Sequence, residues 1–424
     1  FKAVRSILDV MNEVDIASLL STLSDKELAL AFRLIPKDKA AEVFSNMDTS
    51  MQTYLVTMFT EKELKELLDD LYMDDTVDML EELPVKRILA TVSASDRSMI
   101  NQLLNYPEDS AGSIMTTEYV DLREEMTVGQ AMAHIKKTGI HKETIYTCYI
   151  TERRKLVGIV SAKDLMTTDD DVPIKDLMET EIISVYTHAD QEQVAQLFTK
   201  YDLLALPVID QDGRMVGIVT FDDAMDVMVD EATEDITKMA AINPSEKTYF
   251  ETSVLQHAKN RIPWLLILMF TSIITGTIIT RYEFAAIPLL VSFIPMLMDT
   301  GGNCGSQSAT LIIRGIALDE IRFTDLFKVM FKEFRISLIV GAFLAVANGV
   351  RIFIQYHNPG LAVVIACSLM GTVIMAKLVG CTLPLLAKKV NLDPAIMASP
   401  LITTLVDTFS ILIYFNIATV LFRL

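Results

Sequence analysis

Short apolar segments with helical spacing recur every 12 residues between residues 18 and 105. Within each segment the apolar side chains stand three and four residues apart, as on one face of a helix. Short helices of this kind bury their apolar sides only by stacking on neighbours, so the pattern predicts an α-helical superhelical N domain over residues 1–110. A generic helical bundle fits the regular spacing less well. The residues that open the segments are Ser24, Pro36, Asp48, Thr60, Tyr72 and Pro84.

Residues 112–232 contain an internal duplication. The segment Gly158–Asp164 (GIVSAKD) matches the segment Gly217–Asp223 (GIVTFDD), 59 residues further along. Each copy is typical of a strand, a helix, a β-branched strand, a turn, a second strand and a capped helix. We therefore expect two α/β units, over residues 111–172 and 173–232. The two copies resemble a tandem pair of CBS modules.

Long apolar stretches dominate the chain from residue 261 onward. Five of them reach the length of a membrane span, at about 262–280, 284–313, 334–356, 361–387 and 394–422. An acidic helix is predicted before them, over residues 222–241, and Asn243-Pro244 ends it. The chain is thus expected to be multidomain, with the acidic helix and a connector over residues 222–260. A five-span α-helical membrane domain follows over residues 261–424.

Lys and Arg are distributed unevenly between the two sides of the predicted spans. Only Arg281, Arg351 and Arg423 fall on one side. The opposite side has nine: Lys259, Arg261, Arg314, Arg322, Lys328, Lys332, Arg335, Lys388 and Lys389. The positive-inside rule then places the N-terminus in the cytosol and, with five spans, the C-terminus outside. No signal peptide precedes the acidic region, which also predicts that it is cytosolic. We expect a multi-pass protein of the plasma (inner) membrane, in contact with lipid.

The charge of the chain is concentrated in its first part. Residues 261–424 contain 12 Lys/Arg and 8 Asp/Glu, whereas residues 1–260 contain 25 and 48, a net charge of −23. Such an acidic region repels nucleic acid and attracts cations, divalent ions above all. Nucleic acid is therefore excluded as a partner, and divalent cations are expected. The chain has no nucleophile–base pair, P-loop or metal-ligand histidine spacing, so we do not expect an enzyme.

Two of the predicted spans carry polar stripes. Asp407 is the single charge in the last span, with Ser399, Thr403, Ser410 and Tyr414 at helical spacing around it. The second span contains Gly301, Gly302, Asn303 and Gln307, with Thr310 and Arg314 on the same face as the two amides. A carboxylate in hydrocarbon is costly, so such residues face a cavity, a partner or an ion path. A cation pathway is the favoured hypothesis, and a structural acid paired with a neighbouring helix is the alternative.

Two further membrane charges need partners. Asp299 and Lys377 are predicted at similar depth, which suggests that they pair within or between subunits. Snorkelling of Lys377 toward the inner interface is the alternative.

The order of these parts resembles the MgtE family of magnesium channels. The likeness is most specific at residues 288–310 and at Pro400–Asp407 (PLITTLVD). The resemblance implies a homodimer with a pore on the two-fold axis, lined mainly by the second and fifth spans. It implies that Asp407 binds Mg²⁺ in the pore, and Asn303, Gln307, Thr403, Gly301 and Gly302 are the other expected pore residues. Mg²⁺ keeps part of its water shell, so a pore with a few carboxylates and other oxygen ligands suits it.

The resemblance also implies how the pore is controlled. Intracellular Mg²⁺ would bind among the N domain, the CBS pair and the acidic helix, which becomes the plug helix, and hold the pore shut. The acids that map onto this role are Asp74, Asp78, Asp190, Glu192, Asp202, Asp223, Asp226, Glu231, Glu234 and Asp235. ATP is a second implied ligand of the CBS pair, with Tyr146 stacking on the base and Asp164 contacting the ribose. An ion-coupled carrier of Mg²⁺, Co²⁺ or Mn²⁺ and a regulatory Mg²⁺ sensor are the alternative functions.

Overall fold

The structure is a computed structural model, and it describes residues 2–82, 85–245, 249–250, 252–281, 288–318, 320–397 and 399–422. Within helices, the description leaves out the side chains of residues 2, 3, 74, 78, 81, 82, 85–87, 95, 281, 288 and 399. The chain divides into two compact units, Phe1–Val229 and Asp230–Leu424.

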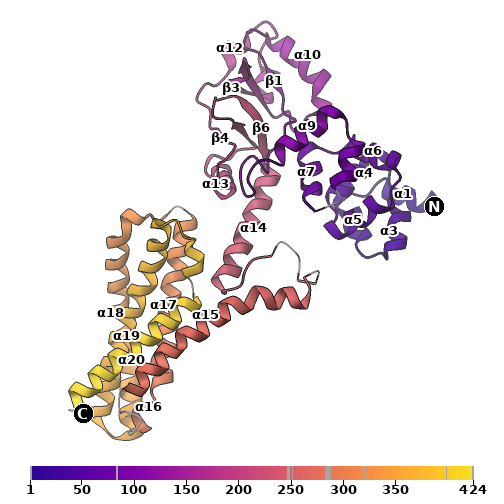
Figure 1. Cartoon of the computed structure of the whole chain (residues 1–424). Coiled ribbons are helices and arrows are strands. Elements are labelled where there is room, and N and C mark those ends of the chain that lie inside the picture. The colour runs from indigo at the N-terminus through magenta and orange to yellow at the C-terminus, as the bar shows by residue number, and fades with distance from the viewer. Residues whose placement is uncertain are drawn as a thin grey trace. The chain divides into compact units, whose positions relative to one another are not determined.

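The first part of unit 1 consists of short helices (Figure 1). Each helix from α3 to α8 begins one residue after a predicted opening residue, which confirms the 12-residue period. Thr60 shows why: its hydroxyl accepts from the backbone of Glu63, whose carboxylate accepts from the backbone of Thr60, so the two residues cap α6. The helices are α1 (Lys2–Leu8), α2 (Glu13–Leu20), α3 (Asp25–Phe32), α4 (Lys37–Ser45), α5 (Thr49–Met58), α6 (Glu61–Leu68), α7 (Met73–Glu82), α8 (Val85–Thr91) and α9 (Ala94–Leu103).

Two α/β modules follow, as predicted. The first contains β1 (Asp121–Leu122), α10 (Val128–Thr138), η1 (Gly139–His141), β2 (Thr147–Glu152), β3 (Lys155–Ser161) and α11 (Ala162–Thr167). The short helix α12 (Ile174–Leu177) leads into β4 (Val185–Tyr186), α13 (Gln191–Tyr201), β5 (Ala205–Ile209) and β6 (Met215–Thr220). In each module the first strand pairs parallel with the second, and the second pairs antiparallel with the third.

The helical domain and the modules share one core within unit 1. Buried residues from Leu8 to Leu103 belong to the same apolar cluster as Val194, Leu206 and Val219 of the second module. Hydrogen bonds cross the junction as well, because the Met73 amide donates to the Glu118 carboxylate at 3.0 Å. The acids of α7 are thereby placed beside those of the modules.

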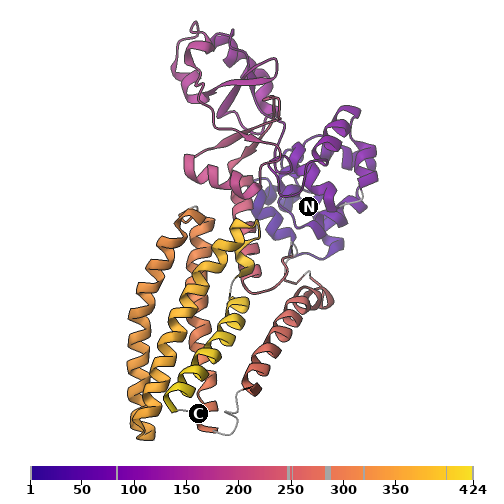
Figure 2. The same cartoon turned by 60° about the vertical axis from the view of Figure 1, so that its left-hand side comes forward.

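Unit 2 is helical, and Figure 2 shows its long helices running side by side (orange to yellow). The acidic helix α14 (Phe221–Met239) begins in unit 1 and ends in unit 2. The other elements are α15 (Val254–Arg281), α16 (Pro288–Val291), α17 (Ile294–Ala317), η3 (Phe323–Asp325), α18 (Leu326–Tyr356), α19 (Pro359–Lys389), η4 (Pro394–Met397) and α20 (Ser399–Phe422).

Four stretches of the described chain are long and apolar enough to cross a membrane: Val254–Thr280, Phe323–Tyr356, Pro359–Lys389 and Pro394–Phe422. They coincide with four of the five predicted spans. The remaining prediction, over residues 284–313, falls on α16, α17 and residues outside the description. Gly, Ser, Asn and Gln make α17 more polar than the four apolar stretches. The fifth span therefore stays a prediction.

Helix α17 packs tightly between α19 and α20. A Cβ atom added to Gly380 of α19 would overlap the carbonyl oxygen of Gly305, so the two backbones touch there. On the other side of α17, a Cβ on Gly302 would come within 2.9 Å of Thr403. Small residues therefore let α17 sit against both neighbours.

Candidate functional site: a polar helix face and an acidic cluster

One side of α17 is polar and exposed in the single chain. Asp299, Asn303, Gln307, Thr310 and Arg314 follow one another at helical spacing, and all five are exposed. We call these five residues the polar face of α17. The amides of Asn303 and Gln307 lie there as predicted. Asp299 was missed as a member, although its position four residues before Asn303 is a signal that could have revealed it.

Gly301 and Gly302 lie on the opposite, buried side of α17. A Cβ on Gly301 would come within 2.7 Å of Thr372 and 2.9 Å of Ser410. The structure therefore does not bring the two glycines to the polar face with Asn303 and Gln307. Their role in the structure is to let α17 pack closely against the neighbouring helices.

Asp407 is half-buried on α20. Its carboxylate is close enough to that of Asp299 for the two to repel each other. The ion pairs of the described residues in unit 2 involve neither carboxylate. Beside it, the Thr408 hydroxyl is 2.9 Å from that of Thr275 on α15. Asp407 thus sits near a second acid and hydroxyl groups.

The predicted stripe around Asp407 is shorter than expected. Ser410 and Tyr414 are fully buried, and their hydroxyls donate to backbone carbonyls, of Val406 at 2.6 Å and of Leu290 at 2.9 Å. Thr403 stays half-exposed. The side chain of Ser399 lies outside the described residues. Ser410 and Tyr414 are therefore structural, because helical spacing alone does not tell which polar groups a neighbouring helix covers.

The predicted pairing of Asp299 with Lys377 within the chain is wrong. Lys377 is buried, and its ammonium lies 3.6 Å from the carboxylate of Glu333 on α18. It donates to the Ser308 hydroxyl at 3.1 Å. Snorkelling is excluded for the same reason. Similar depth in the membrane did not reveal which helix faces Lys377.

Unit 1 holds a group of carboxylates that repel one another. Its members, which we call the acidic cluster, are Asp75, Glu118, Glu143, Asp222 and Asp223. They come from α7, from the two loops around β1 and α10, and from the start of α14. The Glu143 amide donates to the Glu118 carbonyl at 2.9 Å, which holds the two loops together.

Four members of the cluster, Asp75, Glu118, Glu143 and Asp223, have raised pKa values. Burial, followed by repulsion from Asp223, Asp222, Asp75 and Glu118, raises the pKa of Glu143 to about 8. Burial and repulsion from Asp223 and Glu118 raise the pKa of Asp75 to about 6. One carboxylate oxygen of Glu143 is buried without a hydrogen-bond partner. A cation among these groups would remove the repulsion.

Several predicted metal ligands have structural roles. Asp190 caps α13, since its carboxylate accepts from the backbone of Glu192 at 3.0 Å. Glu192 accepts from Gln196 at 3.2 Å, and Asp202 ends α13 in the left-handed conformation. Asp223 belongs to the acidic cluster, and Asp226 follows it on α14. The side chains of Asp74 and Asp78 lie outside the described residues.

The end of α14 is joined to the membrane helices of unit 2. Lys238 pairs with Glu234 at 2.6 Å and with Asp393, just before η4, at 2.7 Å. Burial lowers the pKa of Lys238, but these two partners outweigh it and raise the pKa to about 12. Burial and the Asp393 carboxylate raise the pKa of Asp235. Met239 packs against the apolar cluster that contains Ala395 of η4 and Ile402 of α20. Glu231 lies two turns before Lys238 on the same helix.

The nucleotide candidates are neighbours. Tyr146 is 67% exposed, and its carbonyl accepts from Ala162 at 2.8 Å, at the start of α11. Asp164 lies two residues after Ala162, and its carboxylate accepts from the Ser161 hydroxyl. An exposed ring and a carboxylate therefore lie at one end of the first module.

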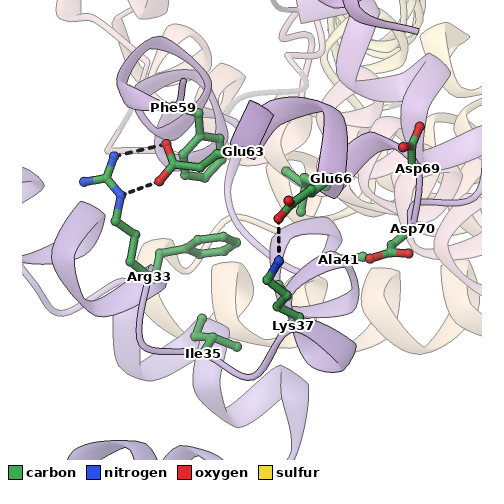
Figure 3. A pocket seen from close by; sticks show the side chains of 12 residues that line it. Arg33, Ile35, Lys37, Ala41, Phe59, Glu63, Glu66, Asp69 and Asp70 are labelled. Carbon is green, nitrogen blue, oxygen red and sulfur yellow. Dashed lines mark hydrogen bonds and ion pairs between the residues drawn. The ribbon is translucent and has the colours of Figure 1, made fainter. Parts of the chain in front are cut away.

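A separate pocket of about 420 Å³ opens on the N-terminal helices (Figure 3). Phe32 and Phe59 form part of its wall, with ring centroids 5.4 Å apart. Its cations are already paired, Arg33 with Glu63 at 2.9 Å and Lys37 with Glu66 at 2.6 Å. The Arg33 partner lowers the pKa of Glu63 to about 2. None of the predicted site residues lines this pocket.

No three His, Cys, Asp or Glu side chains of the described residues are arranged to hold a metal ion together. Among these side chains there is no tight metal cage. Mg²⁺ often keeps several of its waters, so a Mg²⁺ site does not require one.

Family models match most of the chain. A family model described as MgtE, divalent cation transporter, matches residues 294–417. The MgtE intracellular N domain matches residues 11–109, and the CBS domain matches residues 111–170 and 174–230.

Relatives with similar sequences are named as magnesium transporters. The chain is 36% identical to the magnesium transporter MgtE of Thermus thermophilus, over 99% of this chain and 95% of the relative. It is 34% identical to MgtE of Bacillus subtilis, over 98% and 93%. Their names agree with the expectation of a transporter rather than an enzyme.

Solved structures match the first half of the chain. One is the cytosolic domain of the Mg²⁺ channel MgtE in complex with ATP, with a TM-score of 0.52 and 34% identity over 53% of this chain and 94% of that one. Another is the soluble part of a magnesium transporter, with a TM-score of 0.51 and 32% identity over 54% and 91%.

Proposed function

The chain belongs to the MgtE family of magnesium transporters, and from this we propose that it is a Mg²⁺ channel closed by intracellular Mg²⁺. It would work as a homodimer in the plasma (inner) membrane, with the acidic region in the cytosol and the C-terminus outside. The substrate is the hydrated cation.

The polar face of α17 carries the proposal. An Asp or Arg side chain at the centre of a bilayer costs about 3 kcal/mol on insertion scales. Asp299, Asn303, Gln307 and Arg314 are nevertheless exposed on one side of a helix whose other side is buried. Lipid is an unfavourable neighbour for this side, whereas water in a pore or a second subunit is favourable. A two-fold axis beside α17 supplies both.

Asp407 provides the cation site in this pore. A homodimer would contribute two Asp407 carboxylates, with the Asp299 pair close by. Four carboxylates attract a divalent cation, and a pore that leaves Mg²⁺ its inner waters lets it depart again. Asn303, Gln307 and Thr403 add oxygen acceptors along the way.

The acidic cluster suits the proposed gate. Without a cation its carboxylates repel one another, and α14 carries two of them, Asp222 and Asp223. Mg²⁺ would bind the arrangement in which the acids are close and thus favour that state. Near the other end of α14, Lys238 pairs with Asp393, which lies just before η4 and α20. A change at one end of α14 therefore has a physical route to the pore helix.

The direct test measures Mg²⁺ flux in a bilayer with the Asp407→Asn variant. Asparagine keeps the size of the side chain and removes its charge, so flux should fall by about tenfold or more. Asn416→Asp, on the exposed side of the same helix, controls for altered charge on α20. Full flux through a folded Asp407→Asn protein would end the channel proposal. A unitary current far above carrier turnover, suppressed by cytosolic Mg²⁺, would separate the channel from an ion-coupled carrier.

ATP is the proposed regulatory ligand of the module pair. A relative's cytosolic domain holds ATP, and here Tyr146 and Asp164 lie close together with the Tyr146 ring exposed. An aromatic ring and a carboxylate are suited to a base and a ribose. Calorimetric titration of ATP into the purified protein tests this directly.

A further inference from the structure

Three polar side chains meet in the interior of unit 2. Ser308 of α17, Glu333 of α18 and Lys377 of α19 are 0%, 6% and 5% exposed. The Ser308 hydroxyl donates to the Glu333 carboxylate at 2.7 Å, and Lys377 donates to Ser308 at 3.1 Å and pairs with Glu333 at 3.6 Å. We call these residues the buried triad.

Stability alone does not account for the triad. Removing two charges from water is expensive, and replacing a buried ion pair with apolar residues of similar size is often neutral or stabilising. Within a membrane domain, where the other buried side chains of α19 are mostly apolar, the cost is at least as high. Ionisable residues at such depth are usually functional.

The position of the triad points to α17. Ser308 lies one turn beyond Gly305, where the α17 backbone touches Gly380 of α19, and Lys377 lies one turn before Gly380. Ser308 occupies the buried side of α17, whereas Asn303 and Gln307 are exposed on the other side. Glycine contacts fix how closely α17 approaches its neighbours. A directed hydrogen bond to a fixed ion pair adds a specific constraint on the rotation of α17.

We propose that the buried triad is a positioning group that sets the rotation of α17 and so aims Asn303 and Gln307 at the cation path. This inference rests on the proposed channel function. A helix with its side chains is about 10 Å across, so a rotation of ~20° moves its outer atoms by about 2 Å. Such a displacement is large for groups that contact a hydrated ion. None of the three triad side chains touches the cation.

The first test compares Ser308→Ala with Ser368→Ala. Ser368 of α19 is equally buried, but its hydroxyl donates only to the Val364 carbonyl of its own helix, at 2.7 Å. Both variants lose one buried hydroxyl, but only Ser308→Ala removes the hydrogen bonds between α17 and the ion pair. We expect Mg²⁺ flux per folded protein to fall about three- to tenfold in Ser308→Ala, a coupling of ordinary size. Ser368→Ala should match the wild type. Equal flux in all three proteins overturns the proposal.

The second test separates positioning from folding. The double variant Glu333→Leu, Lys377→Met replaces the pair with apolar residues of similar size, and Ser308 can then bond to its own helix. We expect it to melt no lower than the wild type and yet to conduct less, with a changed ratio of Mg²⁺ to Ca²⁺ flux. A charge-swapped variant, Glu333→Lys with Lys377→Glu, keeps the pair and should regain much of the flux. A stable double variant with wild-type flux and selectivity means that the pair is only structural.

The wild type distinguishes the two proposals. If it carries no Mg²⁺, or if Asp407→Asn carries as much, the channel proposal fails. If the wild type carries Mg²⁺, Asp407→Asn carries much less, and the triad variants conduct like the wild type, only the positioning role fails.

Discussion

Glu143→Gln tests whether charge repulsion in the acidic cluster lowers the stability of the folded protein until a cation binds. The pKa of Glu143 is raised from 4.5 to about 8 by burial and by four neighbouring acids. The folded state therefore binds more protons than the unfolded state between about pH 4.5 and 8, and stability falls as pH rises through this window. Glutamine is uncharged and nearly the same size, so it removes the penalty above pH 8 and changes nothing below pH 4.5.

The magnitude follows from the same pKa. A difference between 4.5 and about 8 corresponds to about 5 kcal/mol in full. The side chain is partly exposed, and screening by solvent reduces the expected gain to about 1–3 kcal/mol at pH 8.5.

Urea unfolding of residues 1–245 in the absence of Mg²⁺ provides the measurement, since related soluble regions fold alone. Glu152→Gln, an exposed site at the end of β2, is the matched control. Millimolar Mg²⁺ should stabilise the wild type more than Glu143→Gln, because the variant has less repulsion to relieve. A gain that is absent at pH 8.5, or equally large at pH 5, would refute the reasoning.

Three further predictions concern other parts of the chain. Gly380→Ala should destabilise the membrane domain by about 1–3 kcal/mol in a detergent melting assay, because the new methyl group overlaps the Gly305 carbonyl. Gly276 has open space around it, so Gly276→Ala should be neutral in the same assay. Lys238→Met removes the cation that pairs with Glu234 and Asp393 and lies near Asp235. Mg²⁺ should then bind there more tightly and inhibit flux at a lower concentration, and a higher half-inhibiting concentration would contradict this. Tyr146→Ala should weaken ATP binding about tenfold by calorimetry through lost stacking, and unchanged affinity would remove the ring from the site.

Local regularity made much of the fold predictable. The helices of the N domain follow from a 12-residue period because each helix contacts mainly the helices one and two places along the chain. The two modules follow from a duplication, and Asp210–Gly213 forms the predicted turn between β5 and β6. The acidic helix ends within two residues of its predicted limit. In these segments the sequence pattern and the local structure have the same period.

The candidate site was predictable only in part, because its residues are joined by tertiary contacts. Asp75, Glu118, Glu143 and Asp222 were missed because they are spread over almost 150 residues and meet only where the N domain packs on the modules. Lys377 was assigned the wrong partner because depth in a membrane says nothing about the direction in which a side chain points. Asp407 and Asn303 could be named as candidates because a polar residue in an apolar span is visible in the sequence alone.

The buried triad and the acidic cluster treat buried charge in opposite ways, and the difference matches their proposed tasks. In unit 2, Lys377 and Glu333 neutralise each other and Ser308 completes their hydrogen bonds, so the group has nothing to gain from an ion and favours one rigid arrangement. In unit 1, the pKa values of Asp75 and Glu143 are raised and one Glu143 carboxylate oxygen has no hydrogen-bond partner, so the most stable arrangement of the acidic cluster depends on what binds. A pore helix needs fixed geometry to recognise a hydrated ion, whereas a gate needs two states that the ion can tell apart. A neutralised ion pair suits the first requirement, and carboxylates that repel one another suit the second.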